Sequence, residues 1–222
     1  MSQKYKEIYD KSINNREEFW KNVSEDVFWY KKPTKILNSN NPPFYKWFED
    51  GITNTCYNAL DHHINQGRGE KLAIIYDSPI TGVQKKISYK ELRDRVALFA
   101  GALKKQGVNK GDRVIIYMPM IPEAAIAMLA CGRIGAVHSV VFGGFASNEL
   151  ASRIDDSKAK LIVSASCGYE PGRTVHYKPL VNKALGPASH KPNKCIIFQR
   201  EKDKAELNPS MDITWEESLK DV

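Results

Sequence analysis

The stretch "VIIYMPMIPEAAIAMLACGRIGAVHSVVFGGFASNELASRIDDSKAKLIVS", from Val114 to Ser164, decides the fold. Three apolar runs typical of buried strands alternate in it with two helix-like segments: strands at 114–118, 138–141 and 161–164, helices at 122–134 and 147–157. Successive strands begin 24 and 23 residues apart, the length of one strand plus one crossover helix. We therefore expect parallel neighbours with right-handed connections, in a doubly wound, mostly parallel α/β sheet with helices on both faces. The Ser147 hydroxyl is expected to cap the second helix.

The sequence before this stretch predicts a hairpin followed by a helix. Two short strands, at 72–76 and 86–88, flank a turn that contains proline and glycine. Thr81, Gly82 and Lys85 in this turn faintly resemble a phosphate loop, but a strand follows where a phosphate loop needs a helix, so a plain hairpin is favoured. Ser88 then opens the sequence SYKE, which has the form of a capping box at the start of a helix.

Beyond the deciding stretch the alternation continues, with a helix at about 178–185 and a strand at 194–198. The sequence DITWEESLKDV, from Asp212, then reads as the start of another helix. Because a sheet that stops on a helix opening lacks a closing element, we expect the chain to be a fragment of something longer.

Residues 1–65 differ from the rest and predict an amino-terminal extension, mainly helical or irregular. They are rich in Trp, Tyr, Phe and Asn, with a proline-containing stretch at 38–48. Rings separated by polar residues, such as Trp20 and Trp29, favour an extension that lies on a domain and is anchored by those rings. An aromatic nucleic-acid surface is the alternative, but it normally lies on strands with interleaved basic residues. Residues 66–222 are expected to form an incomplete α/β domain.

Composition and charge narrow the class of protein. The 222 residues are 42% hydrophobic and 27% charged, which suits a sizeable core. No apolar run reaches the roughly 20 residues of a membrane helix, and the amino terminus lacks the apolar core of a secretion signal, so a cytoplasmic protein is expected. The net charge of +7 is scattered in pairs such as Lys31 and Lys32, which favours phosphorylated small molecules over nucleic acid or a membrane.

The titratable residues suggest no metal site and no catalytic arrangement. Four cysteines are far apart and form no CxxC pair, so reduced, mostly buried thiols are expected: Cys56, Cys131, Cys167 and Cys195. His62 and His63 are adjacent on a predicted helix, where their side chains diverge. No Ser/His/Asp or Cys/His arrangement can be argued from spacing.

Two loops at the carboxyl edge of the predicted sheet are candidates for ligand contact, since open parallel sheets bind ligands there. In the loop FGGFAS, Gly143 and Gly144 leave bare backbone for a flat ligand, and Phe142 offers a ring face. The alternative is a tight turn with core rings. In the loop ASCGYEPGRTVHYK, a Pro-Gly turn would present Arg173 to a phosphate. Here the alternative is an ion pair between Arg173 and Glu170.

Two longer stretches resemble a known family. The sequence "WFEDGITNTCYNALDHHI", from Trp47 to Ile64, and the stretch from Gly111 to Ala165 are similar to short-chain acyl-coenzyme A synthetases of the acetyl- and propionyl-CoA type. The resemblance runs through essentially the whole chain. It implies an adenylate-forming enzyme, in which a short-chain carboxylate and ATP give an acyl adenylate and coenzyme A then displaces AMP.

The resemblance also implies coenzyme A contacts, with the ring against adenine and the arginine toward the nucleotide phosphate. Carried over by motif, the contacting residues are Phe142, Gly143, Gly144, Glu170, Pro171, Gly172 and Arg173. Acetate-type members tend to carry a second arginine at the position of Glu170, whereas the EPGR form is similar to the propionate branch. Propionate is thus the expected substrate, with acetate as the other choice.

The residues that the family uses for ATP and Mg²⁺ and its catalytic lysine have no counterpart in these residues, so we expect no catalytic or metal-binding residue and no activity from the fragment alone. The rest of the synthetase chain is its expected partner. Two other readings stay open. One is a stand-alone module that binds coenzyme A or a related nucleotide, and the other is an RNA-binding module driven by positive charge.

Overall fold

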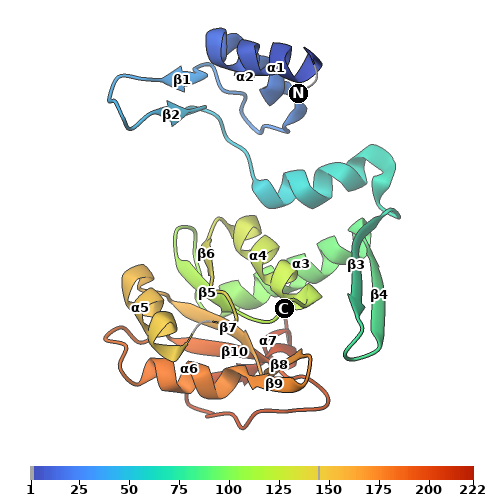
Figure 1. Ribbon diagram of the computed structural model, residues 1–222, viewed down its shortest axis with the longest axis vertical. Helices are drawn as coiled ribbons and strands as arrows, with labels where there is room; N and C mark the ends of the chain where they lie inside the picture. The colour runs from blue at the N-terminus through green and yellow to red at the C-terminus, as the bar shows by residue number, and fades with distance from the viewer. Residues whose placement is uncertain (1–2, 145) are drawn as a thin grey trace. The chain divides into compact units, whose positions relative to one another are not determined.

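The computed structural model describes residues 3–144 and 146–222 (Figure 1). Contacts within the chain divide it into two compact units, Met1–Asn54 and Thr55–Val222, which are described separately. This division falls somewhat before the boundary expected between residues 65 and 66, which stays a prediction.

The first unit is mainly helical and irregular, as expected. Its elements are α1 (Gln3–Asn14), α2 (Arg16–Val23), a 3₁₀ turn η1 (Ser24–Asp26), and two very short antiparallel strands, β1 (Leu37–Asn38) and β2 (Lys46–Trp47). Its rings contact one another: the centroids of Trp29 and Phe48 lie 5.6 Å apart, and those of Trp20 and Trp47 lie 6.1 Å apart. That the rings anchor this unit on the following domain stays a prediction.

The second unit contains a five-stranded parallel sheet with flanking helices and two hairpins. Its elements, in chain order, are η2 (Tyr57–Asp61), η3 (Ile64–Arg68), β3 (Leu72–Ser78), β4 (Val83–Ser88), α3 (Tyr89–Lys105), β5 (Arg113–Tyr117), α4 (Pro122–Ile134), β6 (Val137–Val140), α5 (Ser147–Ser157), β7 (Leu161–Ala165), β8 (Cys167–Glu170), β9 (Arg173–His176), α6 (Tyr177–Leu185), β10 (Lys194–Phe198), β11 (Asp212–Thr214) and α7 (Trp215–Ser218). The predicted α/β fold is confirmed, and β3 and β4 form the predicted hairpin.

The alternation of side chains along β5 explains why helices cover both faces of the sheet. Val114 and Ile116 of β5 belong to the core that includes α3 and α4, whereas Ile115 and Tyr117 belong to the core that includes α5 and α6. Successive side chains of a strand point to opposite faces, so the run VIIY is apolar throughout because both faces are covered. Figure 1 shows α3 and α4 on one side of the sheet and α5 and α6 on the other, as predicted.

The strand order differs from the expectation that consecutive strands would be neighbours. The order is β11-β10-β7-β5-β6, so β6 and β7 both pair with β5 and not with each other. The physical reason lies in burial: β5 is apolar on both faces and suits the interior of the sheet, while β6, with Val137 and Val140 about half exposed, lies at its edge. After β6 the chain reverses its direction of winding.

This reversal defines a topological switch point between β5 and β7. The loop after β5 leads to α4 on one face, and the segment after β7 leads to α6 on the other face. The backbones therefore separate between the carboxyl ends of β5 and β7, which is where open α/β sheets bind ligands.

Three local expectations need correction. The residue before α5 that caps it is Ala146, which provides no side-chain hydrogen bond, and Ser147 is instead buried as the first helical residue. The Ser88 hydroxyl does accept a hydrogen bond from the Glu91 amide (3.2 Å), but the Glu91 carboxylate pairs with Arg95.

The segment from Asp212 begins with the strand β11, and the helix starts only at Trp215, behind a capping box made by Thr214 and Glu217. A strand of three residues is too short to show a periodicity in sequence.

The cysteines are free thiols and all four are buried, as expected. Burial raises the pKa of Cys131 and Cys195 to about 12 and raises that of Cys56 as well. These groups are therefore inert thiols near neutral pH. In the described part of the chain, no three His, Cys, Asp or Glu side chains come together as a metal site would need. None of its helices is long and apolar enough to cross a membrane.

Candidate functional site

The segment after β7 forms a hairpin that presents Arg173. Strands β8 and β9 pair antiparallel, with Glu170 opposite Arg173. Pro171 and Gly172 make the turn between them, and Gly172 has a φ of +76°, which glycine adopts without strain. The Pro-Gly turn agrees with the prediction, whereas the strands that flank it differ from the loop that the sequence predicts.

The Arg173 guanidinium is paired and exposed at once. Its Nη2 and Nε atoms both lie 2.6 Å from Oε2 of Glu170, while 70% of the Arg173 side chain is accessible to solvent. The ion pair with Glu170, the alternative interpretation of this loop, is therefore the state observed. An exposed pair of this kind contributes at most about 1 kcal/mol, so an incoming anion can compete for the guanidinium at small cost.

Position 143 has no room for a side chain, because the buried Tyr177 lies against Gly143. A Cβ atom on Gly143 would lie 1.9 Å from Oη of Tyr177, a side chain only 5% exposed. Burial raises the pKa of Tyr177 to about 12, so its phenol is neutral, and its ring centroid lies 4.9 Å from that of Tyr117. The tight-turn interpretation thus accounts for Gly143 by contacts within the chain.

Phe142 and Gly144 behave differently. The Phe142 side chain is 71% exposed, so its ring is not part of the core. A Cβ atom on Gly144 would lie 2.6 Å from the Phe142 ring, so this ring lies close to the backbone of the turn. Phe145, the second ring of the motif, lies outside the described residues. An exposed ring beside bare backbone is a suitable face for stacking a flat ligand.

The contact between Tyr177 and Gly143 brings the two candidate segments together. Tyr177 directly follows β9, and Gly143 follows β6, so one contact joins the loop after β6 to the hairpin after β7. Both segments lie at the carboxyl edge of the parallel sheet. We call this edge, formed by residues 142–144 and 170–173, the rim; that it binds a ligand stays a prediction.

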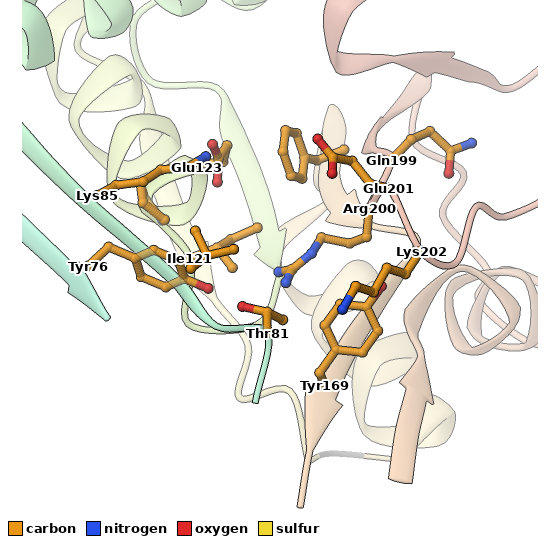
Figure 2. Close-up of a pocket in the computed structure, with 13 residues that line it drawn as sticks. Tyr76, Thr81, Lys85, Ile121, Glu123, Tyr169, Gln199, Arg200, Glu201 and Lys202 are labelled. Atoms are coloured by element: carbon orange, nitrogen blue, oxygen red, sulfur yellow. The ribbon is translucent and has the colours of Figure 1, made fainter. Parts of the chain in front are cut away.

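A pocket near the rim was not foreseen. Arg200, two residues past the end of β10, lines this pocket. Tyr169 of β8 and Thr81 and Lys85 of the β3–β4 hairpin line it as well (Figure 2). No motif marks Arg200; the one signal in the sequence is a cation shortly after a buried strand at the ligand-binding edge. Thr81 and Lys85 are hairpin residues, as the sequence predicts, and the hairpin places them in the pocket.

Comparison with known proteins agrees with this architecture. The family model "AMP-binding enzyme" matches residues 60–218, and the model "Acetyl-coenzyme A synthetase N-terminus" matches residues 5–59. The chain belongs to the AMP-binding enzyme family. Within that family its relatives are short-chain acyl-CoA synthetases, so the resemblance noted in the sequence is confirmed.

Three curated relatives illustrate this. The mitochondrial acyl-CoA synthetase short-chain family member 3 of Rattus norvegicus is 51% identical over 97% of this chain and 32% of its own length. The propionate–CoA ligase of Escherichia coli is 44% identical over 88% of this chain and 31% of its own length. The acetyl-coenzyme A synthetase of Streptomyces coelicolor is 43% identical over 96% of this chain and 32% of its own length. The chain thus spans about a third of the length of these relatives.

A solved structure supports the fold. The acetoacetyl-CoA synthetase from Streptomyces lividans superposes with a TM-score of 0.83 at 23% identity, over 95% of this chain and 32% of that one. This likeness shows that the arrangement of helices and strands is shared.

Proposed function

We propose that this chain supplies the sheet scaffold and part of the coenzyme A site of an AMP-forming short-chain acyl-CoA ligase. The observation that carries the proposal is the contact of Tyr177 with Gly143, which joins the Phe142 loop to the Arg173 hairpin. An exposed ring and an exposed guanidinium at one edge of a sheet suit a ligand that has both a flat base and a phosphate.

In this proposal the residues of the rim have separate roles. Phe142 stacks on the adenine of coenzyme A, and Gly143 and Gly144 let the backbone approach it. The Pro171–Gly172 turn presents Arg173, which binds the nucleotide phosphate. The phosphate competes with the Glu170 carboxylate for the Arg173 guanidinium. We assign no contact with ATP or Mg²⁺ to the described residues. When ATP and Mg²⁺ are bound, they supply the chemistry of adenylate formation. The residues named here bind and orient coenzyme A, which accepts the acyl group.

Propionate is the carboxylate we propose, with acetate as the alternative. The support is the EPGR form of the hairpin turn, in which Glu170 stands where acetate-type members tend to carry arginine. The curated relatives include both a propionate–CoA ligase and an acetyl-coenzyme A synthetase, at nearly equal identity. The cytoplasmic location also stays a prediction, and mammalian relatives are named as mitochondrial.

Titration of the chain with coenzyme A, followed by amide chemical shifts, tests the rim. We expect shifts at residues 142–144 and 170–173. Arg173→Gln should weaken binding about tenfold, because a charge-assisted hydrogen bond to phosphate is lost. Glu170→Gln should strengthen it by about twofold, because an exposed competing carboxylate is removed.

Arg93→Gln, which removes an arginine that pairs with its neighbour Asp94 on α3, serves as the charge control. Shifts confined to other surfaces, or equal loss in the Arg93 and Arg173 variants, would contradict the assignment. Submicromolar affinity, about −8 kcal/mol or better, would support the stand-alone binding module instead.

A second experiment addresses catalysis. We expect the 222-residue chain alone to show no propionate-dependent exchange of label between pyrophosphate and ATP, because the rim binds the acyl acceptor and carries no group assigned to adenylate chemistry. A heat-unfolded sample gives the background. Exchange above that background would show that the chain is an enzyme by itself, against this part of the proposal.

A further inference from the structure

The apolar side of helix α1, in the first unit, stays exposed to solvent. Its members recur at a spacing that places them on one side of a helix, and they are Tyr5, Ile8, Tyr9 and Ile13. Each of these side chains is about half accessible, and none of the described residues of α1 is buried. We call this side the apolar face of α1. An amphipathic helix whose apolar side remains in water indicates an interaction surface.

The apolar face combines rings with aliphatic side chains. The Tyr5 and Tyr9 rings stack, with centroids 6.2 Å apart and an angle of 13° between their planes. A tyrosine has an apolar body and a polar hydroxyl, and for this reason it is enriched where a membrane meets water. Ile8 and Ile13 carry no polar group in their side chains and suit the apolar side of the same boundary.

Lysines border the apolar face on both sides. Lys4 and Lys11 lie one helical turn before and after Ile8, so they border one edge. Lys6 lies three residues before Tyr9 and borders the other edge. All of these lysines are exposed. They are scattered along the sequence, and only the helix brings them to the two edges of one face.

The acidic side chains of α1 lie away from the apolar face. Glu7 and Asp10 are three residues apart and are neighbours on the helix surface. Gln3 and Asn14 continue the same stripe, which runs along the side opposite the apolar face. The helix therefore has cations beside its apolar residues and its anions at the centre of its polar side.

This order of charges selects among possible partners. A second copy that packed face to face would set lysine edges against lysine edges, and like charges repel. A bilayer with anionic headgroups would attract both edges at once. The lysine stems can lie along the apolar side chains while their ammonium groups reach the lipid phosphates. Glu7 and Asp10 would then face water, away from the anionic surface.

We propose that α1 binds reversibly to the surface of a lipid bilayer that contains anionic lipids. The helix lies in the plane of the interface, with Ile8 and Ile13 at the acyl boundary and Tyr5 and Tyr9 at the level of the headgroups. This inference concerns residues of the first unit that the coenzyme A proposal does not use, and neither depends on the other.

The test is co-sedimentation of the 222-residue chain with vesicles of phosphatidylcholine mixed with phosphatidylglycerol. We expect binding that weakens as salt rises and that is about tenfold weaker with phosphatidylcholine alone. Ile8→Asn should weaken binding about tenfold, because an inserted apolar side chain is lost. Lys4→Gln together with Lys11→Gln should weaken it about twentyfold, because each lysine near an anionic surface contributes a factor of about five.

Matched control variants lie in the same unit but outside α1. Ile52→Asn removes another exposed isoleucine, and Lys31→Gln together with Lys32→Gln removes a pair of exposed lysines. Both controls should bind the mixed vesicles within about twofold of the unchanged chain, because charges away from the contact are screened. Thermal unfolding checks that each variant keeps the fold.

The proposal is overturned if the chain does not bind the mixed vesicles, or if the α1 variants bind as tightly as the controls. Sedimentation velocity without lipid addresses the other occupant: a concentration-dependent dimer that Ile8→Asn abolishes would assign the apolar face to a second copy and overturn the lipid assignment. Should Ile8→Asn fail to fold, the double variant of Lys4 and Lys11 decides the matter, because unchanged affinity there overturns the proposal equally.

Discussion

Replacement of Lys178 by methionine is expected to lower the free energy of unfolding by about 3–5 kcal/mol, because it leaves a buried carboxylate without its counter-ion. The Lys178 side chain is 2% exposed and that of Asp212 is fully buried, and Nζ of Lys178 lies 2.8 Å from Oδ2 of Asp212. Lys178 also donates to Asn182, and the Asn208 amide donates to Asp212 (2.7 Å). Among the contacts of the described residues, only that amide hydrogen bond would remain on the carboxylate in the variant. Urea unfolding followed by circular dichroism measures the change.

The double variant Lys178→Met with Asp212→Leu should recover much of the lost stability, because replacement of both charges by apolar groups removes the desolvation cost together with the attraction. Lys183→Met is the matched control, since Lys183 is an exposed lysine on the same helix, α6; its effect should stay within about 0.5 kcal/mol. Equal effects of the Lys178 and Lys183 substitutions would show that the buried pair has no special weight.

Gly143→Ala is the second substitution with a large expected effect, a loss of about 1–3 kcal/mol from overpacking. The new Cβ atom would lie 1.9 Å from Oη of Tyr177 and 2.8 Å from its Cζ atom, and the buried Tyr177 ring has little room to move. The loop must therefore shift. This shift would displace Phe142 and weaken the binding of any ligand that stacks on its ring. Thermal unfolding measures the loss of stability.

Gly144→Ala provides the comparison within the same loop. Its Cβ atom would also meet a ring, at 2.6 Å, but that ring belongs to the exposed Phe142 and can rotate away. We expect a change within about 0.5 kcal/mol. Tyr177→Phe, which removes the nearest atom, should restore part of the stability of Gly143→Ala. Equal losses in the two glycine variants would mean that the Tyr177 contact does not control the loop.

Much of the fold could be predicted from the sequence because its signals are local. The helices at 122–134 and 147–157 and the strand at 194–198 have the predicted bounds, since each follows from a local pattern of apolar residues. Strand order is not local. Whether β6 lies next to β7 or across β5 depends on which strand buries both faces, and a spacing of 23 or 24 residues suits either arrangement.

The candidate site was predicted only in part, for a similar reason. The Pro171–Gly172 turn and its exposed arginine follow from a few adjacent residues. The role of Tyr177 against Gly143, and the approach of Arg200 to Thr81, join residues that are distant in sequence and belong to no motif. Only the tertiary arrangement reveals such contacts.

The contact between Tyr177 and Gly143 has a consequence for cooperativity. Because Tyr177 directly follows β9 and lies against Gly143, a movement of the Arg173 hairpin would change the energy of this contact. Thermodynamic linkage makes such coupling reciprocal. If the two segments bind one ligand as proposed, a fragment that orders one of them would lower the entropic cost of ordering the other, and a molecule that spans both should gain more than the summed affinities of its halves.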